Sequence, residues 1–158
     1  MLADEAQTWQ LLRTHDDPDH LQSPPGYRYD RVNARFNQLA ETINAAFCGQ
    51  CVVDPAQDAS FHGVITIPIL ASSTGRQLHV VISNFKDMAV LAVDNAGEWD
   101  DQETAELLHP GDAEVIHCAL DELGYTLIRT DPCGSGMTAR SHAYVNGRLR
   151  AEKLSRIS

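Results

Sequence analysis

The sequence lacks long apolar runs and a basic leader segment. No stretch of its 158 residues approaches the roughly 18 consecutive apolar residues that a transmembrane helix requires. The opening residues, MLADEAQ, are acidic and lack the basic region and apolar core of a signal peptide. We therefore expect a cytoplasmic protein without a membrane partner.

Cysteine is scarce, with four residues in the chain, and the cytoplasm keeps such thiols reduced. The one C-x-x-C pair, Cys48 and Cys51, closes a predicted helix, where the dipole has the wrong sign to lower a thiol pKa. A zinc site would need two more ligands. The other candidates are scattered along the chain: His62, His117, Cys118 and Cys133. Residues 15–20 combine His and Asp but are also typical of a loop. We expect no metal and no cofactor.

Lysine and arginine are absent from residues 87–128, which hold eleven Asp or Glu. Residues 1–86 carry six bases and nine acids, and residues 129–158 carry six bases and two acids, so this base-free segment accounts for the whole net charge of −10. Direct nucleic-acid binding is not expected, because it needs a cationic surface. The acids form either a solvated surface or one that steers a basic protein partner, including by imitation of nucleic acid.

Hydrophobic periodicity predicts one α+β domain over residues 1–158, since no linker or repeat divides the chain. The two short apolar runs 78–83 and 88–93 are typical of a β-hairpin at its centre. We predict an antiparallel sheet of four to five strands, with two main helices, 31–47 and 113–123, packed on it.

Further strands are expected at 51–54, 61–70 and 125–129, with Pro68 marking an edge or an end. Asp30 and Asp112 are the predicted N-caps of the two main helices, and Asp100 with Glu103 suggests a capping box for a short helix 102–109. Residues 1–30 are expected to form a helix, 2–13, and a loop. The tail 130–158 contains either a hairpin turn at 145–148 or a helix at 147–157.

The segment Asp131-Pro132-Cys133-Gly134-Ser135-Gly136 resembles the cysteine loop of the proline racemase and diaminopimelate epimerase families. The resemblance implies that Cys133 exchanges a proton at the substrate α-carbon without a cofactor. It also implies that the backbone of residues 134–136 binds the substrate carboxylate. The match covers about six residues, and the chain lacks the second cysteine loop and the two similar halves of those enzymes. A plain glycine-rich turn is the competing interpretation.

The segment GRQLHVVISNFKDMAVLAVDN, residues 75–95, and the acidic residues after it loosely resemble the sheet of small acidic immunity proteins that neutralise bacterial toxins. The resemblance is architectural and covers about half of the chain. It implies a basic toxin as partner and occlusion of the toxin's active site. The contact residues would then be acidic: Asp94, Glu98, Asp100, Asp101, Glu103 and Glu106. We favour this binding protein, an antitoxin, over the alternative of a small racemase-like enzyme that uses Cys133.

Overall fold

A β-hairpin forms the centre of the structure, as the two apolar runs predict. Strand β3 spans Leu78–Ser83 and strand β4 spans Met88–Val93, within the bounds expected from the sequence. The two strands pair antiparallel, with Val80 opposite Leu91. The computed structural model is described for the following residues: 6–7, 10, 26–55, 61–84, 87–95, 98–99 and 101–128.

Three shorter strands complete a five-stranded sheet with the order β1-β2-β3-β4-β5. Strand β1 spans Val52–Asp54, β2 spans Phe61–Ile67 and β5 spans Thr126–Leu127. Strand β2 lies inside the sheet and ends before Pro68, which cannot donate a ladder hydrogen bond. Ile69, inside the expected strand 61–70, lies beyond the end of β2 and is exposed.

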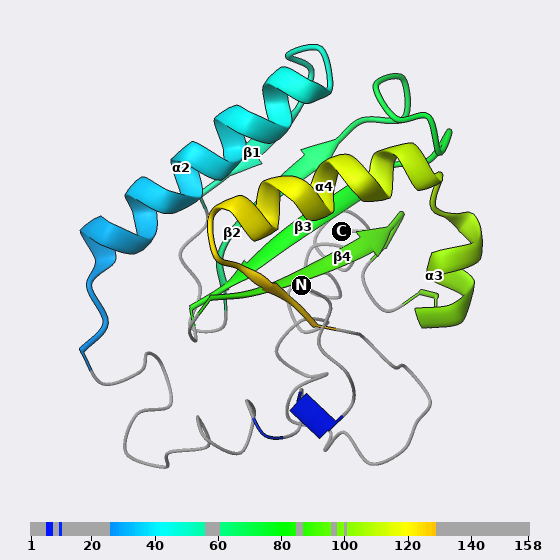
Figure 1. Ribbon diagram of the computed structural model, residues 1–158. Coiled ribbons are helices and arrows are strands. Elements are labelled where there is room, and N and C mark those ends of the chain that lie inside the picture. Colours follow the sequence, from blue (N-terminus) through cyan, green and yellow to red (C-terminus); the bar gives the residue numbers. More distant parts are fainter. Residues whose placement is uncertain are drawn as a thin grey trace, which may run out of the picture.

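The sheet is mixed, so the expectation of a purely antiparallel sheet is wrong at one edge. Strands β1 to β4 pair antiparallel, whereas β5 runs parallel to β4, with Ala89 opposite Leu127. Two helices intervene between β4 and β5 and carry the chain back to the starting end of β4 (Figure 1). A crossover of this kind leaves the next strand parallel to the previous one. The broader α+β class is confirmed.

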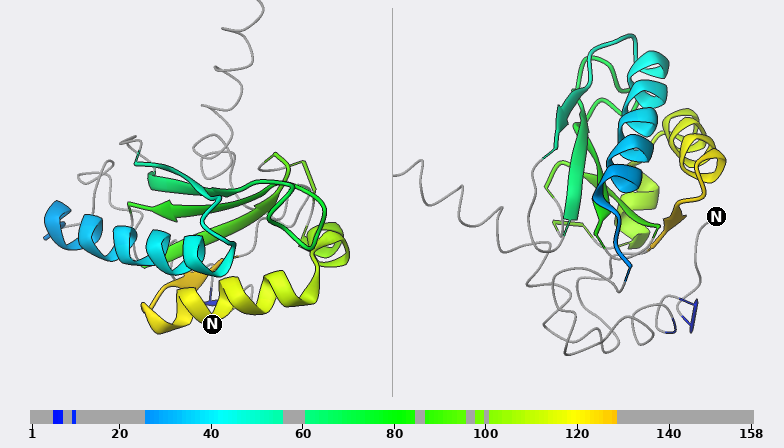
Figure 2. Two further views of the ribbon diagram at one scale, coloured as in Figure 1. Left: turned by 90° about the horizontal axis from the view of Figure 1, so that it is seen from above. Right: turned by 90° about the vertical axis from the view of Figure 1, so that its left-hand side faces the viewer.

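Two long helices cover one face of the sheet and pack against each other (Figure 2). Helix α2 spans Tyr29–Ala46, and helix α4 spans Pro110–Glu122. The short helix α3, Asp101–Leu107, precedes α4 and contacts β4. Most of the predicted helix 2–13, most of the loop after it, and the tail 130–158 lie outside the described residues.

The starts of both long helices differ from the sequence prediction. Helix α2 begins at Tyr29, with Arg28 as an N-cap that makes no side-chain hydrogen bond, so Asp30 lies in the first turn. Helix α4 begins at Pro110, because proline fits the first helical turn and loses no hydrogen bond there. Its cap is His109, whose side chain accepts a hydrogen bond from the backbone N–H of Gly111. Asp112 is therefore not the N-cap.

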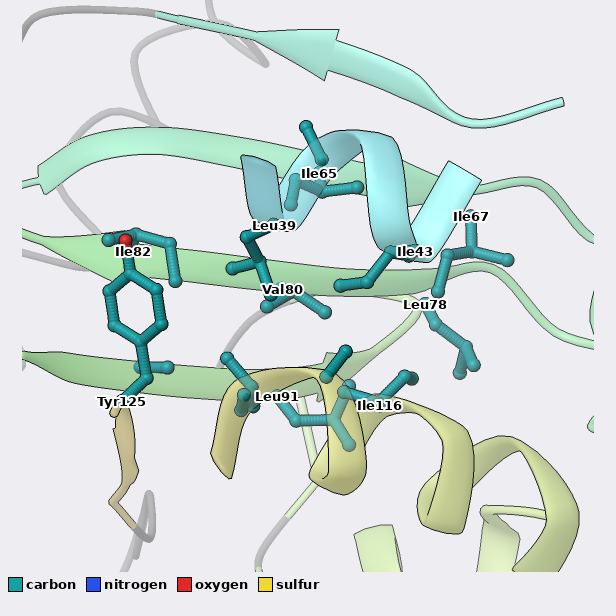
Figure 3. Packing of buried hydrophobic residues seen from close by; sticks show 14 of the residues in the cluster. Leu39, Ile43, Ile65, Ile67, Leu78, Val80, Ile82, Leu91, Ile116 and Tyr125 are labelled. Atoms are coloured by element: carbon teal, nitrogen blue, oxygen red, sulfur yellow. The ribbon is translucent and has the colours of Figure 1, made fainter. Parts of the chain in front are cut away.

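The core lies between the two helices and the sheet (Figure 3). The stripe of α2 is buried at Phe36, Leu39 and Ile43, as the helical spacing predicts. It meets alternate residues of the strands and one face of α4: Ile65, Ile67, Leu78, Val80, Ile82, Leu91, Ile116 and Leu120. Each such side chain contributes about 1.5–3 kcal/mol when fully buried. This core therefore fixes the positions of both helices relative to the sheet.

Candidate functional site

The elements of the base-free segment lie next to one another in the fold. Residues 87–128 supply β4, α3, α4 and β5, and these four elements are neighbours in space (Figure 1). Helix α3 has the sequence DQETAEL and helix α4 the sequence PGDAEVIHCALDE, so neither contains a lysine or an arginine. The uneven charge of the chain is thus also uneven in the fold.

Two acids of this segment are neutralised by arginines from outside it. Asp94, which follows β4, pairs with Arg76, which precedes β3. Asp87, which precedes β4, pairs with Arg35 of α2. Each pair joins the segment to another part of the chain. Asp94 was a predicted partner contact, and the structure places it in an internal ion pair.

A third acid, Asp112, is buried in the first turn of α4 and fastens the loop between β2 and β3. Its carboxylate accepts four hydrogen bonds: from Ser72 Oγ at 3.0 Å, Ser73 N at 3.3 Å, Thr74 N at 2.7 Å and Thr74 Oγ1 at 2.6 Å. Burial alone would raise the pKa of Asp112, but these hydrogen bonds outweigh it and lower the pKa. The carboxylate is therefore a structural anchor.

Three of the predicted contact residues are exposed: Glu98, Glu103 and Glu106. Glu98 accepts a hydrogen bond from Asn95 Nδ2 at 2.7 Å, and Glu106 accepts one from Gln102 Nε2 at 3.1 Å. These donors are neutral amides, so neither hydrogen bond pairs its carboxylate with a cation. Asp101 begins α3, but its side chain is not described, and Asp100 lies outside the described residues.

Trp99 anchors the chain between Glu98 and helix α3. Its side chain packs against the hydrophobic core, and the guanidinium carbon of Arg76 lies 5.5 Å from its ring centroid. Arg76 therefore contacts both Asp94 and Trp99, and it connects the end of β4 to the start of the exposed acidic stretch. A cation over an indole ring contributes about 0.5–1 kcal/mol at a partly exposed site. The acids next to Trp99 are thus held on an anchored backbone.

A polar cluster that the sequence did not indicate lies around the N-terminal half of α2. The guanidinium carbon of Arg35 lies 4.4 Å from the ring centroid of Tyr125, which is buried before β5 and extends toward Ile82 (Figure 3). Burial is the main cause of a raised pKa at Tyr125. His62 of β2 is also buried, against α2. Arg35 and Tyr125 are 90 positions apart, so no local sequence signal indicates their contact, and His62 lies against another part of α2.

The cysteine candidates have separate positions. Cys48 is exposed and Cys51 half-buried after the end of α2, and Cys118 is exposed on α4. Burial raises the pKa of the Cys51 thiol, which disfavours the reactive thiolate. Within the described residues, no group of three or more His, Cys, Asp or Glu side chains is arranged to hold a metal ion. Cys133, its loop 131–136 and the residues 15–20 lie outside the described residues.

No protein-family model, curated protein or solved structure matches this chain. Among the helices of the described residues, none combines the length and the apolar character needed to cross a bilayer. The site is therefore defined by its own geometry: exposed carboxylates on and beside α3, held by the pairing of Arg76 with Asp94 and Trp99.

Proposed function

We propose that this protein binds a basic protein partner through an acidic surface, defined by Glu98, Glu103 and Glu106, and acts as an immunity protein against a basic toxin. One observation carries the proposal: these carboxylates are exposed on or beside α3, while Asp87, Asp94 and Asp112 of the same segment have internal partners. Glu98 and Glu106 accept hydrogen bonds from neutral amides of their own segment, so the exposed negative charge of both is available to a partner.

The mechanism that follows is steering and occlusion. Carboxylates that are held on a helix and an anchored loop attract a basic active site before contact and raise the association rate. Each exposed ion pair adds little to the final affinity, about 0.2–1 kcal/mol. The toxin is then inhibited because the bound protein covers its active site.

A comparison of two charge-reversal variants tests this proposal. The variant Glu103→Lys/Glu106→Lys changes the acidic surface, and Glu41→Lys/Asp54→Lys makes the same change in net charge at exposed positions on α2 and β1. The probe is a basic toxin encoded beside the gene, and the association rate is measured at low and high salt. We expect the first variant to associate about tenfold or more slowly at low salt, with a smaller difference at high salt.

Equal association rates for the two double variants would contradict the proposal, because net charge alone would then govern the encounter. In living cells, the double variant that associates more slowly with the toxin should also protect less well against it. The alternative, a racemase-like enzyme, depends on Cys133 outside the described residues, and no contact of the described residues favours it.

A further inference from the structure

His62 occupies a position in the sheet that ordinary strand alternation would not give it. In β2, the alternate residues Ile65 and Ile67 face the helices and are buried in the core. The register of β2 on β3 shifts between Phe61 and Gly63, so that His62 is the extra residue of a β-bulge. A bulge re-aims the side chain it carries. The imidazole accordingly lies against α2, where its ring centroid is 5.2 Å from that of Phe36.

The surroundings of the imidazole are aromatic and closed to water. His62 is 2% exposed, and Tyr29 lies on another side of it at 5.6 Å between ring centroids. The next residue, Gly63, leaves no room between the strand and the helix, since a Cβ atom there would lie 2.5 Å from Cζ of Phe36. The start of α2 and the bulge are therefore packed in direct contact around the histidine.

The described hydrogen bonds of His62 leave a protonated ring with one donor that lacks an acceptor. Tyr27 donates its proton to Oδ1 of Asn84 at 3.4 Å, so its oxygen accepts from Nδ1 of His62 at 3.3 Å. Nε2 then carries a lone pair, and it has no hydrogen-bond partner within the described part of the chain. A proton on Nε2 would create a buried charge with a donor that lacks an acceptor, which is costly.

The groups that face the ring offer no compensating negative charge at neutral pH. They are the phenol of Tyr27, the phenol of Tyr29 and the ring of Phe36; the amide of Asn84 accepts from the Tyr27 hydroxyl. The neighbour of Phe36 on α2 is Arg35, itself a cation, and its pairing partner is Asp87. Within the described contacts of the imidazole there is thus no carboxylate to stabilise an imidazolium.

We propose that His62 is a pH-sensitive latch between the sheet and the N-terminal half of α2, and that protonation of its ring releases this half of the helix. The helix start depends on such tertiary contacts, because its N-cap, Arg28, makes no side-chain hydrogen bond. Release separates Tyr29 and Phe36 from the bulge and lets water reach the imidazolium. The C-terminal half of α2 stays packed through Leu39 and Ile43.

The direction of the pH effect follows from linkage. Burial lowers the pKa of His62 in the closed state, whereas an opened, hydrated imidazole has a pKa of about 6.5. The latch is therefore fully closed above about pH 6.5 and weakens as the pH falls toward the lowered pKa of the closed state. Uptake of a single proton can raise the opening equilibrium by at most tenfold per pH unit in that window.

Hydrogen exchange measured by NMR on the full chain at pH 7.5 and pH 5.5 tests the latch. Protection factors are compared, so that the intrinsic pH dependence of exchange cancels. For amides 33–36 we expect protection to fall by up to about tenfold at pH 5.5, while amides in β3 and β4 keep theirs. Across a series of pH values, the loss should begin at about pH 6.5 and level off where the His62 ring titrates, followed in the same samples.

Two variants separate the latch from general acid destabilisation. In His62→Gln, which stays neutral at both pH values, the pH-dependent loss at amides 33–36 should disappear. His79→Gln is the matched control, because His79 is another histidine of the sheet, half-buried in β3, with Nδ1 3.0 Å from Thr66 Oγ1. That variant should keep the loss. The proposal is overturned if protection is unchanged at pH 5.5, if it falls equally in β3 and β4, or if the loss persists in His62→Gln. If His62→Gln does not fold, the ring titration decides, and a loss of protection that keeps growing below the pH at which the His62 ring titrates overturns the latch.

Discussion

Removal of the carboxylate of Asp112 should loosen the attachment of α4 to the loop between β2 and β3. This side chain is 4% exposed and accepts four hydrogen bonds from residues 72–74, which lie 38 to 40 positions away in the chain. One of its donors, Thr74 Oγ1, also accepts from the backbone N–H of His109, the residue that caps α4. The loop, the cap and the first helical turn are thus one hydrogen-bonded unit.

The magnitude follows from the number and kind of these bonds. A hydrogen bond to a charged group typically contributes about 1.5–3 kcal/mol, but the loop donors regain water when the acceptor is lost. We therefore expect Asp112→Ala to lower the free energy of unfolding by about 2–4 kcal/mol. Asp112→Asn should lower it by about 1–2 kcal/mol. Its oxygen can replace Oδ2, which has three of the four donors, and its NH2 group then faces the N–H of Ser73.

The pH dependence gives the sharper test. Because the folded pKa of Asp112 is lowered, its stabilisation is present above the unfolded pKa of about 3.9 and is lost as the pH falls through the folded pKa. The difference between parent and Asp112→Asn, measured by urea unfolding, should be largest at pH 7 and shrink below about pH 4. Glu114→Gln, at an exposed position of the same helix, should change stability by less than about 0.5 kcal/mol. A difference that stayed constant from pH 7 to pH 3 would refute this account of Asp112.

Two further predictions concern the core. Gly63→Ala should lower the free energy of unfolding by about 1–3 kcal/mol, because the added Cβ would lie 2.5 Å from Cζ of Phe36 and 3.0 Å from the backbone oxygen of Asp54. A double-mutant cycle with Phe36→Leu, followed by thermal unfolding, should show that the smaller side chain relieves part of this cost, and strictly additive losses would contradict the clash. Ile116→Asp and Leu39→Asp should each abolish the cooperative unfolding transition, since both residues are fully buried and no cation pairs with them in the core cluster. A variant that melted like the parent would show that its helix is wrongly placed.

The sequence predicts the elements whose signal is local. The hairpin 78–83 and 88–93 was predictable because two short apolar runs flank a polar break. The stripe of α2 was predictable from its helical spacing. The orientation of β5 was not, because two residues do not specify a direction and the crossover through α3 and α4 decides it. Pro110 fits a helix break and a first helical turn equally well, and the structure has the latter.

The candidate site was predictable in its charge but not in its partners. Exposure of Glu98, Glu103 and Glu106 follows from their place among polar residues, and α3 lies close to the expected short helix. The pairing of Asp94 with Arg76 requires the register of the hairpin, which sets residues 77 and 94 together at one end. His62 was considered only as a candidate zinc ligand, and its burial against α2 could not be predicted, since a single shift in the pairing of β2 determines the direction of its side chain.

The base-free segment therefore combines two classes of acid that a count of charges does not separate. Asp87, Asp94 and Asp112 lie where β4 or α4 meets the rest of the chain, and each has a partner from outside the segment. Changes to them should alter stability and leave the field of the exposed surface largely intact. Glu106 is exposed on α3 and accepts only a short-range hydrogen bond from Gln102 among its described contacts, so Glu106→Lys should slow the encounter with a basic partner and change stability by less than about 0.5 kcal/mol. Variants of the two classes should therefore have different effects, on folding in one case and on binding in the other. Both classes lie within the same 42 residues, 87–128.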